Sequence, residues 1–283
     1  YRIDIIFDLM GLSSSNRIAL FKNRLAPIQI LWLGYNNTSG LKEMDYLMVD
    51  SNLIEKNEAK FYSEKLLFLP SIWNCHSGIA DFRKETPSPL IKNKYITFGS
   101  FNNINKISDE VIDVWSEILK KTSNSRLILK SSQPFACENL RQKFKKNKVL
   151  DLVTFLDRKN NFVDHIEEYK NIDVALDTFP YNGVTTSFEA IWMGIPVLTL
   201  KGFNPNSRAG VSINKNINMD YFIANNKDEY TSKAIELSNN FEKVIDARKH
   251  LFDNALASNL FNVKKFSKEF FVTLENINSL HAS

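Results

Sequence analysis

Cysteine is scarce in this sequence: its 283 residues contain two, Cys75 and Cys137, which lie far apart. They form no C-x-x-C pair and are too few for a disulfide scaffold, so neither a redox motif nor a zinc motif of that kind is indicated. A reducing compartment is the simpler interpretation, and we expect a cytoplasmic protein. The apolar stretch Ile3–Met10 contains Asp4 and Asp8 and is far too short to cross a bilayer, so we expect no membrane span.

Several catalytic motifs are also missing. There is no H-E-x-x-H and no G-x-S-x-G, so zinc protease and serine hydrolase activities have no support. No D-x-D occurs, which argues against a nucleotide-sugar site of the type that uses a bridging metal ion. The formal net charge is +4, and Lys and Arg are mixed with Asp and Glu rather than gathered in a stripe. Charge alone therefore does not suggest nucleic acid as a partner.

Apolar and aromatic residues, in contrast, are plentiful. Hydrophobic residues make up 43% of the chain and aromatic residues 12%, enough for one large domain or two mid-sized ones. In the first third of the chain, short apolar runs alternate with helical patterns. Helices are expected at Asn16–Leu25 and Leu53–Ser63. The expected strands are Ile3–Leu9, Ile28–Leu33, Tyr46–Val49 and Leu66–Leu69.

A linker is predicted at Arg83–Lys94, where two prolines and clustered polar residues interrupt the pattern. After it the alternation of strands and helices is cleaner. The clearest helix is Ser108–Lys121, whose apolar residues share one face: Val111, Val114, Trp115, Ile118 and Leu119. The other expected helices are Cys137–Lys146, Phe162–Lys170 and Thr185–Trp192. The expected strands are Ile96–Phe101, Arg126–Lys130, Leu152–Leu156, Asp173–Asp177 and Pro196–Leu200.

This alternation predicts βαβ units and a parallel sheet that is covered on both faces. The tail of the chain, roughly Lys227 to Leu280, is expected to be helical. It carries an apolar stripe formed by Val263, Phe266, Phe270, Phe271 and Leu274.

The segment from Asp173 to Leu198 carries the strongest signal for a ligand. A buried strand ends at Asp177, a Pro-Tyr-Asn-Gly loop turns the chain, and Thr185 or Thr186 then caps a helix. Ligands of open α/β sheets bind beyond the carboxyl ends of strands, and the free N–H groups of a helix N-terminus suit a phosphate. In the alternative interpretation, the two threonines only cap the helix.

Three further side chains are candidates. Glu189, one turn into that helix, could reach a ribose hydroxyl, or it is simply an acid that favours the helix dipole. Lys106 follows the strand Ile96–Phe101 in an asparagine-rich loop and could neutralise a phosphate, although a lone lysine is usually solvated. His165 lies on a partly apolar helix, where a histidine is more often structural than functional.

Together these residues resemble the catalytic region of the O-linked N-acetylglucosamine transferase/SPINDLY family, and most of all its bacterial branch. The likeness extends over nearly the whole chain, because many short motifs follow one another in the family's order. They are Asp8-Leu-Met-Gly, Asn16-Arg, Ala26-Pro-Ile-Gln, Trp32-Leu-Gly-Tyr, Thr38-Ser-Gly, Met44-Asp-Tyr, Tyr62-Ser-Glu-Lys-Leu, Phe101-Asn, Lys106, Trp115, Ile118-Leu, Leu176-Asp-Thr-Phe-Pro-Tyr-Asn-Gly, Thr185-Thr, Trp192-Met-Gly-Ile-Pro-Val and Ser207-Arg. The resemblance implies an α/β protein of the GT-B fold, with two Rossmann-like lobes, parallel sheets and a nucleotide sugar bound mainly by the second lobe.

The resemblance also implies a domain organisation. Residues 1–94 would form the N-terminal, acceptor-side lobe and end in the linker, residues 95–245 the nucleotide-sugar-binding lobe, and residues 246–283 C-terminal helices that pack back across the lobes. The chain starts at Tyr1, almost directly in a strand, whereas the family's first lobe begins earlier with a strand that bears an active-site histidine. We therefore expect a fragment with a truncated first lobe, which binds UDP but does not glycosylate protein on its own.

Carried over position by position, the resemblance assigns most of the candidate residues to the second lobe. Lys106 would contact the diphosphate, with Asn103 beside it. Thr185 and Thr186 would hold phosphate at the helix N-terminus. His165 would lie near the uridine and the diphosphate.

Two further assignments, and three departures from the motifs of the family, concern the sugar and its surroundings. Glu189 stands where the family has an acid that contacts the ribose, and Gly34 would line the sugar side from the first lobe. Val184 replaces a polar residue just before the threonine pair, and Leu12 stands where many bacterial members have histidine. Asn36-Asn37 replaces a pair of the Pro-Gly type.

The implied activity is that of an inverting glycosyltransferase, which moves a sugar, expected to be GlcNAc, from UDP-GlcNAc to the Ser or Thr hydroxyl of a protein. Lys106 would be the catalytic residue, because it stabilises the departing diphosphate together with the Thr185 helix end. No metal and no cofactor are expected, since the lysine and the helix dipole carry the charge. The alternatives are an inactive nucleotide-sugar-binding or scaffold module, which Val184 and Leu12 favour, and a transferase that uses another sugar or a non-protein acceptor.

Overall fold

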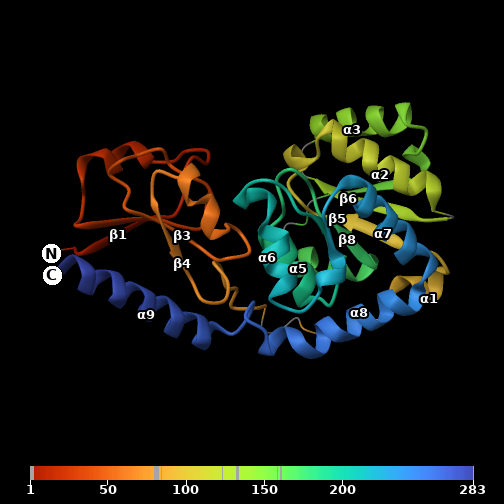
Figure 1. The fold of residues 1–283 in the computed structure, drawn as a ribbon. Helices are drawn as coiled ribbons and strands as arrows, with labels where there is room; N and C mark the ends of the chain where they lie inside the picture. Colours follow the sequence, from red (N-terminus) through yellow and green to blue (C-terminus); the bar gives the residue numbers. More distant parts are fainter. Residues whose placement is uncertain are drawn as a thin grey trace.

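The computed structural model describes residues 3–79, 83, 85–122, 124–131, 134–157, 159 and 161–282, without the side chains of residues 131, 134–135 and 278–282. The described chain forms two α/β lobes that lie side by side, each built on a parallel sheet of its own (Figure 1). The first lobe is drawn in red and orange, and the second runs from yellow to blue. This division confirms the expected α/β class.

The first lobe contains a four-stranded sheet in the order β1-β2-β3-β4. The strands are β1 (Ile5–Asp8), β2 (Ile28–Leu31), β3 (Tyr46–Val49) and β4 (Lys65–Phe68). All neighbouring strands are parallel, with Ile5 opposite Ile28 and Tyr46 opposite Lys65. The apolar runs therefore predicted all four strands, with ends that differ by one or two residues.

The two helices predicted for this lobe are wrong. Asn16–Leu25 contains only the 3-10 helix η1 (Ile18–Asn23), and Leu53–Ser63 only the 3-10 helix η2 (Lys56–Phe61). A surface α-helix is stabilised mainly by an apolar stripe that it buries. Here η1 buries Phe21 alone and η2 buries none of its own side chains. Neither segment can therefore gain the packing that would extend it into an α-helix.

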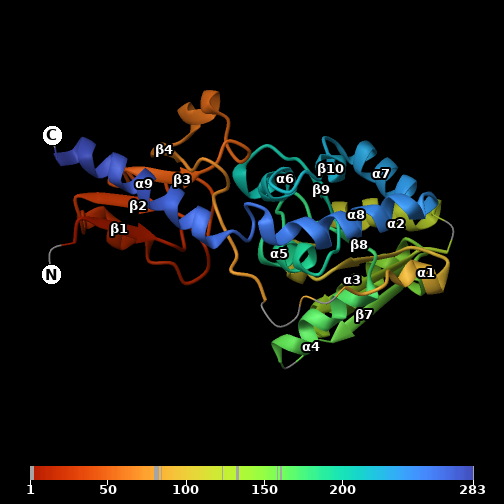
Figure 2. The same cartoon turned by 90° about the horizontal axis from the view of Figure 1, so that it is seen from below.

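One face of the first sheet is covered by the C-terminal helix α9 (Val263–Ala282), which lies across the strands in Figure 2. Because side chains of a strand alternate between its two faces, Ile28 and Ile30 pack on this side with Tyr46, Met48 and Leu69 of the neighbouring segments. The helix contributes Phe266, Phe270, Leu274 and Ile277.

The predicted stripe of this helix is therefore right in part. Val263 and Phe271 are exposed to 42% and 62%, so they do not belong to the packed face. Phe271 follows Phe270 directly and is rotated by about 100° around the helix axis, which turns it away from the sheet.

The second lobe contains a six-stranded parallel sheet in the order β10-β9-β8-β5-β6-β7. Its strands are β5 (Thr97–Ser100), β6 (Arg126–Ser131), β7 (Val153–Asp157), β8 (Val174–Leu176), β9 (Val197–Leu200) and β10 (Ile223–Ala224). The α-helices are α2 (Asp109–Lys121), α3 (Pro134–Lys146), α4 (Phe162–Glu167), α5 (Thr185–Trp192), α6 (Ala209–Lys215), α7 (Lys227–Asn239) and α8 (Phe241–Asn254). The elements expected for this lobe are confirmed, while α6 and the two-residue strand β10 were not predicted.

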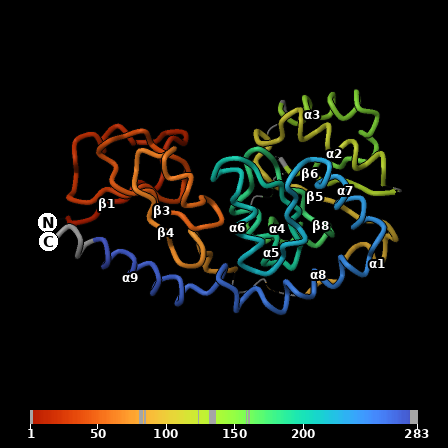
Figure 3. Tube along the Cα trace, in the orientation of Figure 1, coloured from red at the N-terminus to blue at the C-terminus, as the bar shows by residue number. Residues whose placement is uncertain are grey.

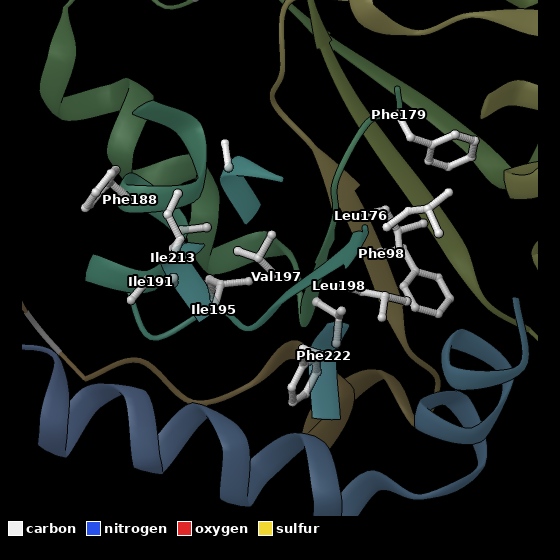
Figure 4. Packing of buried hydrophobic residues seen from close by; sticks show 14 of the residues in the cluster. Phe98, Leu176, Phe179, Phe188, Ile191, Ile195, Val197, Leu198, Ile213 and Phe222 are labelled. Atoms are coloured by element: carbon white, nitrogen blue, oxygen red, sulfur yellow. The ribbon is translucent and has the colours of Figure 1, made fainter. Parts of the chain in front are cut away.

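The core of this lobe lies between the sheet and its helices. Figure 4 shows Phe98, Leu176 and Leu198 of three neighbouring strands among side chains from helices and loops, such as Phe188 of α5. Helix α2 is the clearest case: the Ser108 Oγ accepts a hydrogen bond from Val111 N–H, and the apolar face predicted from the spacing is buried. Burial on this scale fixes the strand ends that carry the candidate site.

The chain passes between the lobes twice. It leaves the first lobe after β4 and reaches α1 (Pro89–Asn93), which lies within the predicted linker, and it returns from α8 through residues 255–262 to α9 (Figure 3). The two passages touch, because His76 N–H donates to the Leu260 carbonyl at 2.9 Å. Helix α8 runs through residues 245 and 246, where the boundary between the second lobe and the C-terminal helices was predicted.

Direct contacts also join the lobes. The Arg208 guanidinium donates to both carboxylate oxygens of Glu58, at 2.6 and 2.8 Å. Ser212 Oγ donates to the Asp50 carboxylate at 2.6 Å. Among the described residues, no helix is long and apolar enough to cross a membrane.

Candidate active site

The second sheet has its topological switch point between β5 and β8. Strand β5 is flanked by β6 on one side and β8 on the other, so the connections that follow β5 and β8 leave in opposite directions. Such a switch point is where open α/β sheets bind ligands, beyond the carboxyl ends of the strands. The candidate residues of the sequence follow these two strands.

A cleft of about 470 Å³ lies between the lobes at these strand ends. The second lobe lines it with residues of the loops after β5, β8 and β9 and with the start of α5, and the first lobe lines it with two loops. The residues are Leu33, Gly34, Asn36 and Asn74 from the first lobe, and Asn102, Asn103, Lys106, Tyr181, Asn182, Val184, Thr185, Thr186, Asn206 and Ala209 from the second.

Asp177, directly after β8, organises the floor of this region. Its carboxylate accepts hydrogen bonds from Thr178 N–H at 2.9 Å, Gly183 N–H at 2.7 Å and the Thr199 hydroxyl at 2.8 Å. The side chain is 1% exposed, and this burial raises its pKa to about 6 although the hydrogen bonds oppose the shift. Asp177 therefore closes the Pro-Tyr-Asn-Gly loop onto the end of its own strand.

Steric crowding explains why glycine occupies position 183, at the end of that loop. A Cβ at this position would lie 2.4 Å from Asn102 Oδ1 and 2.6 Å from Thr186 Oγ1. Thr186 Oγ1 itself donates to Asn102 Oδ1 at 2.6 Å. The absence of a side chain thus lets the loops after β5 and β8 meet.

The start of α5 corrects the expected cap. Val184 is the N-cap residue and makes no side-chain capping hydrogen bond, while Thr185 and Thr186 are the first two residues of the helix. The first N–H groups of an α-helix have no partner within the helix. With a valine as the cap, this helix end faces the cleft with its positive dipole uncompensated by a capping oxygen.

Lys106, at the end of the 3-10 helix η4 (Ile104–Lys106), reaches the same place from the loop after β5. Its Nζ donates to the Asn182 carbonyl at 2.8 Å and lies 4.3 Å from the centroid of the Tyr181 ring. Burial lowers the pKa of the ammonium, and the charge of Asp177 opposes this shift. Asn103 caps η4 by accepting from Asn105 N–H at 3.0 Å and is otherwise exposed beside the lysine.

His165 and Glu189 are not among the residues that line this cleft but form a partly buried network behind it. His165 Nε2 is 3.0 Å from the Glu189 carboxylate, and Lys130 Nζ is 2.6 Å from His165 Nδ1. The Tyr169 hydroxyl donates to the same Glu189 oxygen at 2.9 Å and lies 3.2 Å from the Thr186 carbonyl. A charged Lys130 would donate to Nδ1, which leaves the proton of a neutral His165 on Nε2, directed at Glu189.

Three positions of the first lobe were singled out from the sequence, and each has its own surroundings in the structure. A Cβ on Gly34 would lie 2.3 Å from the Leu9 carbonyl, so glycine is required there for backbone packing as well as lining the cleft. Asn36 N–H donates to Asn206 Oδ1 across the cleft at 3.2 Å. Leu12 is 50% exposed and is not among the residues that line the cleft.

Several residues that shape the site, among them Asp177, Tyr181, Asn102, Lys130 and Tyr169, were not predicted from the sequence. Asp177 and Tyr181 stand in the motif that was singled out, but no role was given to them. Asn102 directly precedes Asn103 and Tyr169 follows His165 by four residues, but neither was singled out, whereas Lys130 becomes a neighbour of His165 only through the fold. A lysine or asparagine at the end of an expected strand was the one signal that could have identified Lys130 and Asn102.

Metal ligands are not gathered at this site. Within the described ranges, no group of three or more His, Cys, Asp or Glu side chains is arranged so that it could hold a metal ion. The positive charge that the described part of the cleft offers therefore comes from Lys106 and the start of α5.

Solved structures define the class of the fold. The described chain superposes on a mutant of the Thermobaculum terrenum O-GlcNAc transferase with a TM-score of 0.90 and 29% sequence identity, covering 99% of this chain and 54% of that one. Anabaena HepE, solved with UDP and glucose, matches with a TM-score of 0.62 at 13% identity over 96% of this chain and 78% of its own, which supports the fold alone. The protein has the GT-B fold of glycosyltransferases, as expected.

The family follows from the sequence comparisons. The family model described as glycosyl transferase family 41 matches residues 2–85 and 88–270, and this chain belongs to that family. It is 34% identical over 284 residues to the "Probable UDP-N-acetylglucosamine--peptide N-acetylglucosaminyltransferase SPINDLY" of Eustoma exaltatum subsp. russellianum. It is 29% identical over 298 residues to the corresponding SEC protein of Arabidopsis thaliana.

Each match covers nearly all of this chain but only a small part of the relative. They include 98% and 100% of this chain but only 30% of each of these two relatives. The chain thus spans less than a third of the length of the curated relatives that it matches.

Proposed function

We propose that this chain is the catalytic part of a glycosyltransferase that moves GlcNAc from UDP-GlcNAc to Ser or Thr hydroxyls of proteins. The observation that carries the proposal is the convergence of Lys106 and the N-terminus of α5 on one cleft between the lobes. A nucleoside diphosphate is the chemistry that suits an ammonium beside free helix N–H groups. The names of the related SPINDLY and SEC proteins support the choice of donor and acceptor.

In the proposed reaction, the acceptor hydroxyl oxygen bonds to the anomeric carbon as the bond from that carbon to the β-phosphate oxygen breaks, and the hydroxyl proton passes to the departing diphosphate or to water. Negative charge grows on the departing diphosphate, where Lys106 donates hydrogen bonds and the dipole of α5 adds a fixed positive potential. Thr185 offers its hydroxyl and backbone donors to the same phosphates and Thr186 its backbone donor, because the Thr186 hydroxyl already donates to Asn102. The charge is neutralised by these groups without a metal ion or a cofactor.

The remaining assignments belong to the nucleoside and the sugar. Following the family resemblance, we assign Glu189 to the ribose, through the carboxylate oxygen that His165 and Tyr169 leave available, and His165 to the uridine and the diphosphate. Both side chains lie behind the cleft, and His165, at 23% exposure, is the more accessible of the two. Asn103 extends the polar wall next to Lys106, and Gly34 lines the sugar side. We place the reaction in the cytoplasm, in keeping with the free thiols of Cys75 and Cys137.

Calorimetry with UDP tests the diphosphate site. Lys106→Met should weaken UDP binding about 10- to 100-fold, since a charge-assisted hydrogen bond contributes about 1.5–3 kcal/mol. The matched control is Lys120→Met, an exposed lysine on α2 of the same lobe, which should bind UDP as the parent does. Equal UDP affinity of the Lys106→Met variant and the parent would refute the site.

Turnover tests the chemistry. In a form of the protein that transfers GlcNAc from UDP-GlcNAc, Lys106→Met should lower kcat by about 10²-fold. The change in KM should be smaller. Thr185→Val combined with Thr186→Val should weaken UDP binding as well.

A second candidate is a nucleotide-sugar-binding module without transfer activity. The apolar side chain of Val184 lines the cleft at the N-cap of α5 and offers no hydrogen bond there, which favours this alternative. UDP binding that depends on Lys106, with neither transfer nor hydrolysis of the donor in any form of the protein, would establish it.

A further inference from the structure

Tyr181 is a residue of the cleft to which neither the family motifs nor the proposed mechanism gives a role. It belongs to the loop between β8 and α5, lines the cleft and is 37% exposed, whereas Phe179 two residues earlier is 2% exposed in the core. Its ring lies under the ammonium of Lys106, with 4.3 Å between Nζ and the ring centroid. An aromatic ring in that position attracts the cation through its negative face.

The surroundings of the ammonium explain why a ring face is useful there. Among the described residues, Nζ donates one hydrogen bond, to the Asn182 carbonyl, and an ammonium has three donors. A further carbonyl or carboxylate in place of the ring would hold the charge but would occupy a donor that the diphosphate needs. The ring face attracts the charge and leaves the donors available to oxygens in the cleft.

The cleft that Tyr181 lines is also lined by Leu33 and Gly34 of the first lobe. Burial and the nearby Tyr35 hydroxyl, from the first-lobe loop that contains Gly34, both raise the pKa of Tyr181. Tyr181 therefore lines the same cleft as the lysine of the second lobe and this loop of the first.

We propose that Tyr181 is a positioning residue for donor binding: its ring face holds the Lys106 ammonium at the cleft with its free donors directed at the diphosphate. The inference rests on the proposed function, because it acts through the diphosphate site. It assigns the contribution to the ring and not to the hydroxyl, and it makes the effect of Tyr181 depend on the presence of Lys106.

A double-mutant cycle with calorimetry tests this dependence. Tyr181→Leu removes the ring and should weaken UDP binding about 3- to 30-fold, the range expected for loss of about 0.5–2 kcal/mol of cation–π attraction. Uridine, which has no phosphate, should bind this variant within twofold of the parent. Tyr181→Phe keeps the ring and should bind both ligands as the parent does.

The decisive measurement is Tyr181→Leu in the background of Lys106→Met. Without the ammonium, the substitution should no longer change UDP affinity, whereas a ring that merely fills space would weaken binding equally in both backgrounds. Tyr181→Met serves as a second ring-free variant if thermal unfolding shows that the leucine variant is destabilised.

The outcomes separate the two proposals. If Lys106→Met leaves the ratio of UDP to uridine affinity unchanged, the diphosphate site itself is wrong. If that ratio falls but Tyr181→Leu and Tyr181→Met bind UDP like the parent, only the role of Tyr181 is overturned. A loss in Tyr181→Phe as large as in Tyr181→Leu would also overturn it, because the hydroxyl would then be responsible.

Discussion

Asp177 is a carboxylate buried at the end of β8, and its titration is coupled to folding. Its pKa in the folded state, about 6, lies above the unfolded value of 3.8, so the native state binds the proton more tightly. The contribution to stability is therefore complete below about pH 4 and is lost as the pH rises to about 6. At about 1.4 kcal/mol per pKa unit, the amplitude is about 3 kcal/mol.

Asp177→Asn should remove this titration while it keeps a carbonyl oxygen for the Thr178 and Gly183 N–H groups. Measured by urea unfolding, the stability of the variant relative to the parent should rise by up to about 3 kcal/mol between pH 4 and pH 7. Asp151→Asn, at an exposed position, is the control and should show no such change. A difference between variant and parent that is constant with pH would contradict the assignment.

Tyr169 is fully buried and supplies one of the two described donors to the Glu189 oxygen. Tyr169→Phe should lower the free energy of unfolding by about 1–3 kcal/mol, because a buried carboxylate loses a hydrogen bond that water cannot replace. Thermal and urea unfolding give the loss, and Glu189→Gln in both backgrounds gives the coupling. Unchanged stability of Tyr169→Phe would show that the network does not support α5.

Helix α9 attaches the C-terminal end of the chain to the first sheet through one aromatic face. The ring of Phe270 lies 4.9 Å from Trp32 and 5.8 Å from Phe7, centroid to centroid. Phe270→Ala should destabilise the first lobe by about 1–3 kcal/mol through lost burial. Phe271→Ala is a matched control on the same helix, since Phe271 is 62% exposed and should change stability by less than about 0.5 kcal/mol. Equal losses in both variants would contradict this packing.

The elements that could be predicted from the sequence are those whose signal is local. Helix α2 has a serine cap and an apolar face within one short segment, and the strands of both sheets have apolar runs of their own. The cap of α5 could not be predicted, because the backbone of Val184 is set by the loop that Asp177 holds. The 3-10 helices of the first lobe were mistaken for α-helices, because only tertiary packing shows that they have no face to bury.

The candidate site was predicted to a similar extent and for a similar reason. Lys106, Thr185 and Thr186 follow strands directly, so the topology of a parallel sheet brings them together, and their binding roles remain predictions. The network of Lys130 and Tyr169 with Glu189 was not foreseen. It depends on which strand neighbours which and on where α4 returns, and neither follows from the residues alone.

At the scale of the whole molecule, the lobes are joined by the ion pair of Arg208 and Glu58. Arg208 lowers the pKa of Glu58, so the stability that the pair provides is present above about pH 4.5 and is lost as the pH falls through the folded-state pKa. A double-mutant cycle with Glu58→Ala and Arg208→Ala should give a coupling of about 1 kcal/mol or more at pH 7, and the coupling should decrease as the pH is lowered from 4.5 through the folded-state pKa. A coupling that does not decrease when the carboxylate is protonated would show that charge is not its origin.

The two chain passages between the lobes have a mechanical consequence. A single flexible tether would let one lobe both swing and swivel relative to the other. Here the hydrogen bond from His76 N–H to the Leu260 carbonyl fastens the two passages to each other, so the lobes are connected by two linked chain segments. The contact lies close to the cleft, because Asn74, two residues before His76, lines it. The hydrogen bond that ties the two passages together therefore also holds the chain segment that forms part of the first-lobe wall of the cleft.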